Sequence, residues 1–156
     1  MKNLPIVCIA GKNEIAVFGL YVLVNTIGKE NIRVCLNSDD TNHPSWQPSL
    51  LRHASELGVK IVELPELYEE ESLVFLSLEF DKIIAPSKFR TNELFNIHFS
   101  MLPAYKGVYT ACWPILNGEK ISGVTLHKIE QGIDTGNIIS QAQIELTDAM
   151  TSRAVS

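Results

Sequence analysis

The sequence lacks any pair of cysteines at the spacing of a metal or redox motif. Its three cysteines, Cys8, Cys35 and Cys112, stand far apart, and two of them lie in apolar runs. We therefore expect reduced cysteines in a cytoplasmic protein, with no disulfide. His98 and His127 have no ligand-like neighbours, so we expect no metal site.

An excess of basic residues and a long apolar run are absent too. The chain has 13 Lys and Arg residues against 18 Asp and Glu residues and a formal net charge of −5, which argues against a nucleic-acid partner. The longest apolar stretch, residues 15–24, has about half the length of a membrane span. The N-terminal apolar run is followed at once by Lys12 and Glu14 instead of a cleavage site. We expect a cytoplasmic protein without membrane contact.

What is present is the pattern of a globular domain, with 46% hydrophobic and 20% charged residues in a chain that fits one domain, 1–156. The expected strands cover residues 4–10, 32–36, 59–62, 82–85, 95–99, 121–129 and 138–144. The expected helices cover residues 14–27, with Asn13 as N-cap and Gly28 as stop, 49–57, 69–76 and 110–116. This alternation predicts an α/β fold: a doubly wound, Rossmann-like, mostly parallel sheet with an antiparallel C-terminal edge.

The first candidate loop is AGKNE, residues 10–14, between the first strand and the first helix. The start of a helix presents free backbone N–H groups, which attract phosphate, and Lys12 adds a positive charge. The motif is neither GxGxxG nor a Walker loop. A plain tight turn with a surface lysine is the alternative.

The second candidate is FNIHFSMLPAYKG, residues 95–107, in which Asn96 and His98 lie two positions apart on a strand. They therefore share one face of that strand. An amide N–H and an imidazolium can both donate to a developing oxyanion, and a histidine can also move a proton near neutral pH. The alternative is a satisfied core histidine. Ser100 follows closely, but no G-x-S-x-G elbow surrounds it.

The third candidate is the loop HKIEQGIDTGNII, residues 127–139, in which Gly132 and Gly136 flank Asp134. The glycines allow a sharp turn that aims the carboxylate inward. A carboxylate beside a histidine can orient the ring and stabilise its charged form. Ordinary turn chemistry is the alternative for this aspartate.

Three segments in this order, FNIHFSMLPAYKG, NGEK and GVTLHKIEQGIDTGNII, resemble the formyltransferases that use N10-formyltetrahydrofolate. The signature of that family is an Asn-x-His strand, a Ser-Leu-Leu-Pro-like loop with a following Gly, and a Gly-Val-Thr-x-His strand leading to a catalytic Asp. The resemblance covers nearly the whole chain and is densest over residues 80–139.

The resemblance implies that Asn96, His98 and Asp134 are catalytic. The substrate amine would attack the formyl carbon, Asn96 and His98 would stabilise the tetrahedral oxyanion, and Asp134 would hold His98 and help to manage protons. The family's folate pocket maps here to two sets of residues, Ile83, Ile84 and Phe89 on one side and Ile129, Glu130 and Gly132 on the other.

Within the family, this sequence looks most like the sugar-nucleotide N-formyltransferases of O-antigen and lipopolysaccharide assembly. The segments that carry this likeness are AGKNEIAVFGLYVL, SWQPSL and FLSLEFDKIIAPSKF. Those enzymes formylate the amine of a dTDP-linked 4-amino-4,6-dideoxy sugar, of the dTDP-4-amino-4,6-dideoxyglucose type. The residues implied to bind this small-molecule nucleotide sugar are Lys12, Asn13, Trp46, Gln47 and Lys82. The alternative for Trp46 is packing against the sheet edge.

Three rival functions stay open at this point. The nearest is phosphoribosylglycinamide formyltransferase of purine biosynthesis. A methionyl-tRNA formyltransferase would need a basic tRNA-binding domain, which this acidic chain lacks. The last is a folate- or nucleotide-sugar-binding module without turnover. Because Thr147 and Asp148 look like the start of a helix, we expect the catalytic domain to lack a C-terminal segment, and the resemblance also allows a homodimer.

Overall fold

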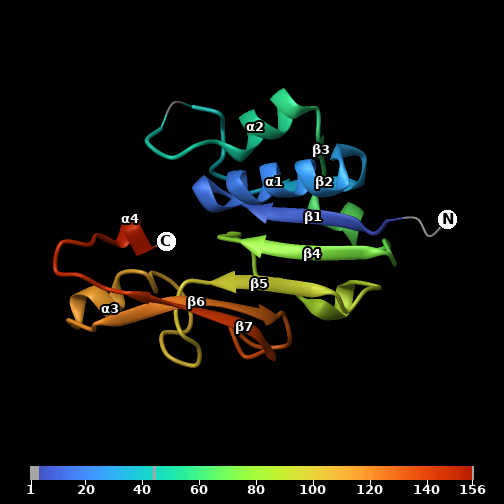
Figure 1. Ribbon diagram of the computed structural model, residues 1–156. Coiled ribbons are helices and arrows are strands. Elements are labelled where there is room, and N and C mark those ends of the chain that lie inside the picture. The colour runs from blue at the N-terminus through green and yellow to red at the C-terminus, as the bar shows by residue number, and fades with distance from the viewer. Residues whose placement is uncertain (1–3, 44, 156) are drawn as a thin grey trace. The chain divides into compact units, whose positions relative to one another are not determined.

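The computed structural model describes residues 4–43 and 45–155, and the chain divides into two compact units. The first unit is Met1–Leu94 and the second is Phe95–Ser156, and each is considered by itself (Figure 1). In the described part of the chain, none of the helices has the length and apolar character needed to cross a membrane.

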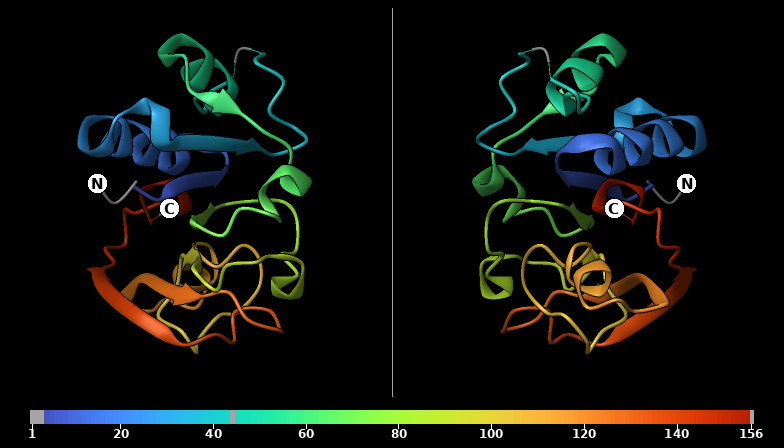
Figure 2. Two further views of the ribbon diagram at one scale, coloured as in Figure 1. Left: turned by 90° about the vertical axis from the view of Figure 1, so that its right-hand side faces the viewer. Right: turned by 90° about the vertical axis from the view of Figure 1, so that its left-hand side faces the viewer.

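Unit 1 is built on parallel strands in the order β3-β2-β1-β4. They are β1 (Ile6–Gly11), β2 (Ile32–Leu36), β3 (Lys60–Ile61) and β4 (Leu73–Leu78). The helices are α1 (Asn13–Ile27) and α2 (Leu50–Leu57), and α1 lies across one face of the strands (Figures 1 and 2). The fully buried side chains of this core include Ile9, Leu20, Ile32, Leu50, Leu73, Phe75 and Leu78.

The β1–α1 turn brings the end of β1 very close to β4. A Cβ atom on Gly11 would lie 1.8 Å from the carbonyl oxygen of Leu78, so only glycine lets β1 and β4 approach here. The predicted cap at Asn13 is wrong, since α1 begins at Asn13 and Lys12 holds the N-cap position without a side-chain cap. The Asn13 amide instead donates to Glu79 Oε2 at 2.7 Å, and both residues have a positive φ.

Most other predicted elements of unit 1 are confirmed. The predicted second helix exists as α2, with Ser49 as its cap: the hydroxyl accepts the backbone N–H of Arg52 at 3.1 Å. The helix ends at Gly58, whose φ of 67° lies in the left-handed region that glycine tolerates.

Two predicted elements of unit 1 are wrong. Residues 69–76 do not form a helix, because the apolar run LVFLSL forms the buried strand β4 in parallel register with β1. The acidic residues before that run imitate a helix start, but they lie outside the strand. Residues 82–85 form no strand: they lead without ladder pairing into the short 3₁₀ helix η3 (Pro86–Lys88). Two further 3₁₀ turns are η1 (Lys29–Asn31) and η2 (Leu64–Leu67).

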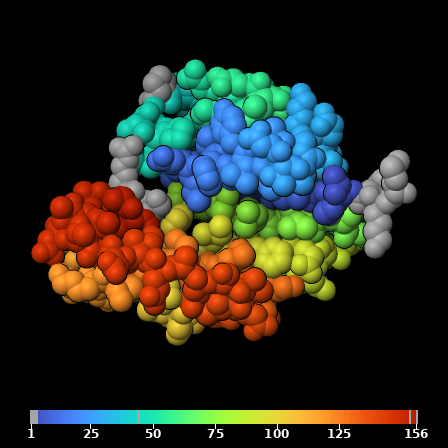
Figure 3. Space-filling model, viewed as in Figure 1, coloured from blue at the N-terminus to red at the C-terminus, as the bar shows by residue number. Residues whose placement is uncertain are grey.

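Unit 2 is antiparallel, in the order β5-β6-β7. The strands are β5 (Leu94–His98), which begins one residue before the unit, β6 (Ile121–Lys128) and β7 (Ile138–Glu145). The predicted pair of C-terminal strands is therefore confirmed. β7 is almost wholly exposed, and Figure 3 shows its atoms on the surface.

The helices of unit 2 are short. The predicted helix 110–116 shrinks to α3 (Trp113–Leu116), in which Pro114 occupies the first turn. The helix start expected at Thr147 and Asp148 is only a turn, closed by a bond from the backbone N–H of Met150 to the carbonyl of Thr147, and α4 (Ser152–Val155) begins later.

Candidate active site

The face shared by β5 and β6 brings three polar side chains together. In the antiparallel register, Asn96 lies opposite His127, and His98 lies opposite Thr125. Asn96 Nδ2 lies 3.1 Å from His127 Nε2. Both histidines are buried, with 6% and 2% of their surfaces exposed. The sequence analysis placed Asn96 and His98 on one face but missed His127 as their neighbour.

Asp134 connects this face to the loop after it. Its Oδ2 accepts the backbone N–H of Gly107 at 2.8 Å and lies 3.4 Å from His98 Nδ1. Its Oδ1 accepts from Asn96 Nδ2 at 3.4 Å and lies 3.5 Å from His127 Nε2. One carboxylate, with 11% of its side-chain surface exposed, therefore touches all three polar residues of the strands.

The turn that carries Asp134 packs closely on β6. A Cβ atom on Gly136 would lie 1.8 Å from the carbonyl oxygen of Lys128, so glycine is required for this approach. Asp134 itself has a φ of 52°, in the left-handed region that only a few non-glycine residues adopt. The structure thus brings together Asn96, His98 and Asp134, the three residues that the family resemblance singled out.

The electrostatics of the cluster favour an ionised Asp134. Burial on its own would raise the pKa of this carboxyl, but hydrogen bonds from the protonated His127 ring and from the Gly107 amide, together with the charges of His98 and His127, lower the pKa below its ordinary value. Burial would likewise lower the pKa of His127, yet the Asp134 hydrogen bond, the Lys128 carbonyl and the Asp134 charge raise it. The site is therefore arranged around a carboxylate and the His127 imidazole, whose charged forms stabilise each other.

The tautomer of neutral His127 follows from its partners. Its Nδ1 lies 2.8 Å from the carbonyl oxygen of Lys128, and a carbonyl can only accept a hydrogen bond. The proton of the neutral ring therefore belongs on Nδ1, and the Nε2 lone pair accepts from the Asn96 amide. His127 thus orients the amide that the sequence analysis assigned to the oxyanion.

A buried hydroxyl supports the loop after β5. Thr125 Oγ1 donates to the carbonyl of Ser100 at 2.7 Å and accepts the backbone N–H of Leu102 at 3.1 Å. Gln141 Nε2, from β7, donates to Thr125 Oγ1 and to the Leu102 carbonyl, each at 2.9 Å. The Ser100 hydroxyl is also bound to the backbone, donating to the carbonyl of Ala104 at 2.6 Å. Ser100 is therefore part of the support of the loop.

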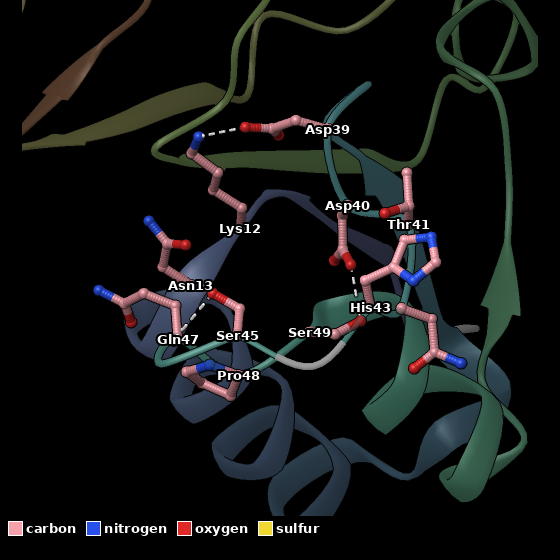
Figure 4. A pocket seen from close by; sticks show the side chains of 11 residues that line it. Lys12, Asn13, Asp39, Asp40, Thr41, His43, Ser45, Gln47, Pro48 and Ser49 are labelled. Carbon is pink, nitrogen blue, oxygen red and sulfur yellow. Dashed lines mark hydrogen bonds and ion pairs between the residues drawn. The ribbon is translucent and has the colours of Figure 1, made fainter.

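The residues expected to bind the nucleotide sugar all lie in unit 1, and three of them line a cavity of about 200 Å³ (Figure 4). These three are Lys12, Asn13 and Gln47. Trp46 is 67% exposed and is not among the lining residues, and Lys82 is exposed with its ammonium 5.8 Å from the ring centre of Phe80.

The charged side chains of this cavity already have hydrogen-bond partners. Lys12 Nζ donates to Asp39 Oδ2 at 2.7 Å, and this hydrogen bond is the main reason why the pKa of Lys12 is raised. Asp40 accepts from the Ser49 hydroxyl at 2.6 Å and from the backbone N–H of Leu51 at 3.0 Å. Lys12 is therefore ion-paired, and an anionic ligand would compete with Asp39 for it.

The residues expected to hold the folate lie in different settings. In unit 1, Ile84 is buried and Phe89 packs edge-on against Tyr68, with ring centres 4.9 Å apart, whereas Ile83 is 83% exposed. In unit 2, Ile129 is half-buried. Glu130 and Gly132 are exposed.

The described residues give little support for a metal site or a reactive cysteine. In the described residues, no group of three or more His, Cys, Asp or Glu side chains is placed to hold a metal ion. Cys8, Cys35 and Cys112 are free thiols, and burial raises the pKa of Cys35 to about 11, where the reactive thiolate is scarce at neutral pH.

Comparison with solved structures shows the fold. An N-formyltransferase from Helicobacter canadensis, solved with folinic acid and dTDP-3-aminofucose, is 48% identical with a TM-score of 0.91 over 97% of this chain. WlaRD, a sugar 3N-formyl transferase solved with dTDP and 5-N-formyl-THF, is also 48% identical, with a TM-score of 0.92 over 98% of this chain. The predicted α/β class, mostly parallel with antiparallel C-terminal strands, is confirmed.

Sequence comparison extends the likeness to a curated relative. A methionyl-tRNA formyltransferase from Synechococcus sp. (strain JA-3-3Ab) is 34% identical over 110 residues, which are 69% of this chain. The match covers 32% of that relative and 56% of each of the two solved chains, so this chain spans about a third to just over half of their lengths. The family model described as formyl transferase matches residues 40–156, more than half of the chain. The chain therefore belongs to the formyl transferase family.

Proposed function

We propose that this chain is the catalytic part of an enzyme that transfers a formyl group from N10-formyltetrahydrofolate to the amine of a nucleotide-linked sugar. The observation that carries the proposal is the buried cluster of Asn96, His98 and Asp134, found in a chain 48% identical to two sugar N-formyltransferases. We include in the proposal one catalytic domain over residues 1–156 and a cytoplasmic location.

The cluster fits formyl transfer to an amine. A bond forms between the amine nitrogen and the formyl carbon, the bond from that carbon to the folate nitrogen breaks, and the amine loses a proton that the folate nitrogen gains. The formyl oxygen gains negative charge on the way, which calls for a preorganised donor such as the Asn96 amide. The proton calls for a group that can take it up and release it, and we assign this role to His98 with the Asp134 carboxylate beside it.

The loop of residues 129–133 fits the edge of a pterin. Its backbone lies outside the strands, and its one hydrogen bond recorded in the described residues joins the Thr135 hydroxyl to the Gln131 carbonyl at 3.4 Å. Backbone N–H and C=O groups suit the alternating donors and acceptors of such a ring. We propose Ile129, Glu130 and Gly132 for this role, with Ile83, Ile84 and Phe89 as the apolar set from unit 1.

For the second substrate we propose a dTDP-linked amino sugar. Lys12, Asn13, Gln47, Trp46 and Lys82 are the proposed contacts. For the amine we favour carbon 3, because the two solved neighbours are described with dTDP-3-aminofucose and as a sugar 3N-formyl transferase, whereas the sequence alone favoured carbon 4. A role in O-antigen or lipopolysaccharide assembly belongs to the same proposal.

A formyl-transfer assay with four acceptors tests the proposal. We expect product from dTDP-3-amino sugars, less from dTDP-4-amino sugars, and none from phosphoribosylglycinamide or methionyl-tRNA. The matched control is the Asp134→Asn variant, which keeps the size of the side chain and removes its charge. Thermal shift with each ligand separates binding from turnover, because a ligand that binds the folded state raises the melting temperature. Binding without product from any acceptor would make the chain a binding module.

The second candidate function is formylation of methionyl-tRNA. The 34% identity to the Synechococcus enzyme favours it, and the net charge of −5 opposes it, because RNA binding depends on basic residues. Turnover of methionyl-tRNA with a steep loss of affinity in added salt, and no turnover of amino sugars, would establish this candidate instead.

A further inference from the structure

The loop after β5 takes an unusual backbone path. Tyr105, Gly107 and Tyr109 have φ angles of 53°, 92° and 59°. Tyrosine rarely adopts the left-handed region, because its Cβ atom then crowds the backbone. Such a path persists only where surrounding contacts hold it. For Tyr105, both ends of the residue have such contacts.

The side-chain end of Tyr105 is held by the turn that follows α3. Its hydroxyl donates to the carboxylate of Glu119 and accepts from Asn117 Nδ2 at 2.8 Å. This turn is itself bonded to α3, since the backbone N–H groups of Asn117 and Glu119 donate to helix carbonyls at 3.0 and 2.9 Å. The hydroxyl is thereby tied to a defined piece of backbone.

The backbone end of Tyr105 reaches the catalytic histidine. Its carbonyl oxygen lies 2.7 Å from His98 Nε2 and 3.2 Å from the Ser100 hydroxyl. A carbonyl oxygen carries no proton, so His98 Nε2 must be the donor. The other ring nitrogen, Nδ1, faces Asp134 at 3.4 Å, and the ring edge meets His127 with ring centres 6.3 Å apart.

We propose that Tyr105 is a positioning residue for His98. Held through its hydroxyl by Glu119 and Asn117, it keeps its carbonyl at His98 Nε2. The proton of the neutral imidazole is thereby fixed on Nε2, and Nδ1 becomes the nitrogen that takes a further proton beside the Asp134 carboxylate. The effect of Tyr105 on catalysis rests on the proposed function, whereas its effect on the tautomer of His98 does not.

This arrangement divides the work within the cluster. Since the Nε2–H group of neutral His98 is hydrogen-bonded to the Tyr105 carbonyl, the ring has a lone pair on Nδ1 and no second N–H group to donate. His98 then acts as a base assisted by Asp134, and donation to the formyl oxygen falls to Asn96. The sequence analysis had assigned that donation to Asn96 and His98 together.

Nitrogen-15 NMR of the imidazole rings reads the tautomer directly. The chain has four histidines, so a His98→Asn variant identifies the His98 signals. At about pH 9, where histidine is neutral, we expect wild-type His98 in the Nε2–H form. Tyr105→Phe keeps the ring and removes the hydroxyl, and we expect a mixture of both tautomers with kcat lowered about tenfold and KM values within about twofold.

Two further variants separate positioning from general disturbance of the loop. Tyr109→Phe is the matched control, because Tyr109 lies in the same loop with a positive φ and is 76% exposed. We expect it to leave both tautomer and kcat unchanged. Glu119→Gln retains an acceptor oxygen for the Tyr105 hydroxyl and should stay near wild type, whereas Glu119→Ala should resemble Tyr105→Phe.

Each outcome decides the proposal without reference to the substrate. An Nδ1–H form in the wild type overturns it, and this measurement needs no variant to fold. An unchanged tautomer in folded Tyr105→Phe and Glu119→Ala overturns it as well. If the tautomer changes as expected while no acceptor is formylated by the wild type, the positioning role stands and the proposed function alone fails.

Discussion

The polar groups of unit 2 and those of unit 1 are organised in different ways. In unit 2, Asp134 contacts three polar side chains in a buried cluster, and a backbone carbonyl accepts a hydrogen bond from each histidine ring. In unit 1, Lys12 and Asp39 pair at a cavity where the carboxylate side chain is 61% exposed. Buried groups with satisfied hydrogen bonds keep one arrangement, whereas exposed ion pairs exchange partners readily. Unit 2 therefore holds a preorganised polar cluster, whereas unit 1 holds an exposed ion pair that can exchange partners.

Removing the centre of the buried cluster should have the largest effect. We expect Asp134→Ala and His98→Ala each to lower kcat at least about a hundredfold, the scale of losing an acid–base or oxyanion contact. Steady-state kinetics with saturating donor and acceptor checks this, and thermal denaturation shows that the variants fold. Rates near wild type in either variant would refute the roles given to these residues.

Replacing His127 should have an intermediate effect. We expect His127→Asn to lower kcat about tenfold, because the Asn96 amide loses the acceptor that orients it. The raised pKa of His127 also predicts a pH dependence, since a raised folded-state pKa adds stability below the unfolded pKa that is lost as the pH rises through the folded one.

The pH dependence of His127→Asn is measured by urea unfolding. The variant should lose most unfolding free energy at mildly acidic pH, where the lowered pKa of Asp134 keeps that carboxylate charged, and least at alkaline pH. His43→Asn, at an exposed histidine of unit 1, is the matched control for the substitution itself. A loss that grows with pH would contradict the assigned contact.

The ion pair of unit 1 should give a smaller effect. We expect Lys12→Gln to weaken binding of the sugar nucleotide about tenfold at low salt. This loss of affinity should shrink with added salt more than the loss in Phe89→Leu does, because an exposed charge is screened by ions. Asp39→Asn should instead strengthen binding by a few-fold, since it leaves Lys12 to the diphosphate. Titration calorimetry at two salt concentrations checks both. Equal loss of folate and sugar affinity in Lys12→Gln would count against this role.

The smallest effect on the unfolding free energy is expected at one of two buried hydroxyls of β6, and the other hydroxyl provides the comparison. The Ser122 hydroxyl is buried without a hydrogen-bond partner in the structure, so Ser122→Ala should change the unfolding free energy by less than about 1 kcal/mol. Thr125→Val removes a hydroxyl with three partners and should cost about 2 kcal/mol. Chemical denaturation of both variants checks the pair. Equal losses would mean that the hydrogen bonds of Thr125 add little.

The sequence predicted the parts of the site that depend on local geometry. Strand alternation put Asn96 and His98 on one face, and the glycines beside Asp134 predicted a sharp turn. The partnership with His127 depends on the register between β5 and β6, which is set by tertiary contacts and has no local signal. His127 and Asp134 are seven residues apart in the sequence. Periodicity alone does not reveal that the loop between β6 and β7 folds back onto β6.

The errors in unit 1 have a similar origin. The run LVFLSL carries no alternation, because a strand buried between neighbours is apolar on both faces, and acidic residues before it suggested a helix. Asn13 is a good N-cap residue type, yet its amide is bound to Glu79, 66 residues later. A partner so distant in sequence overrides a local preference.

The Thr125 network sets an order of events during synthesis. The loop that carries Ser100 and Leu102 is bonded to Thr125, and Gln141 of β7 completes these bonds. A nascent chain that has released only β5 and β6 still lacks the amide that closes the network. As domains fold while they emerge from the ribosome, the loop after β5 gains these hydrogen bonds in full only after β7 has been released.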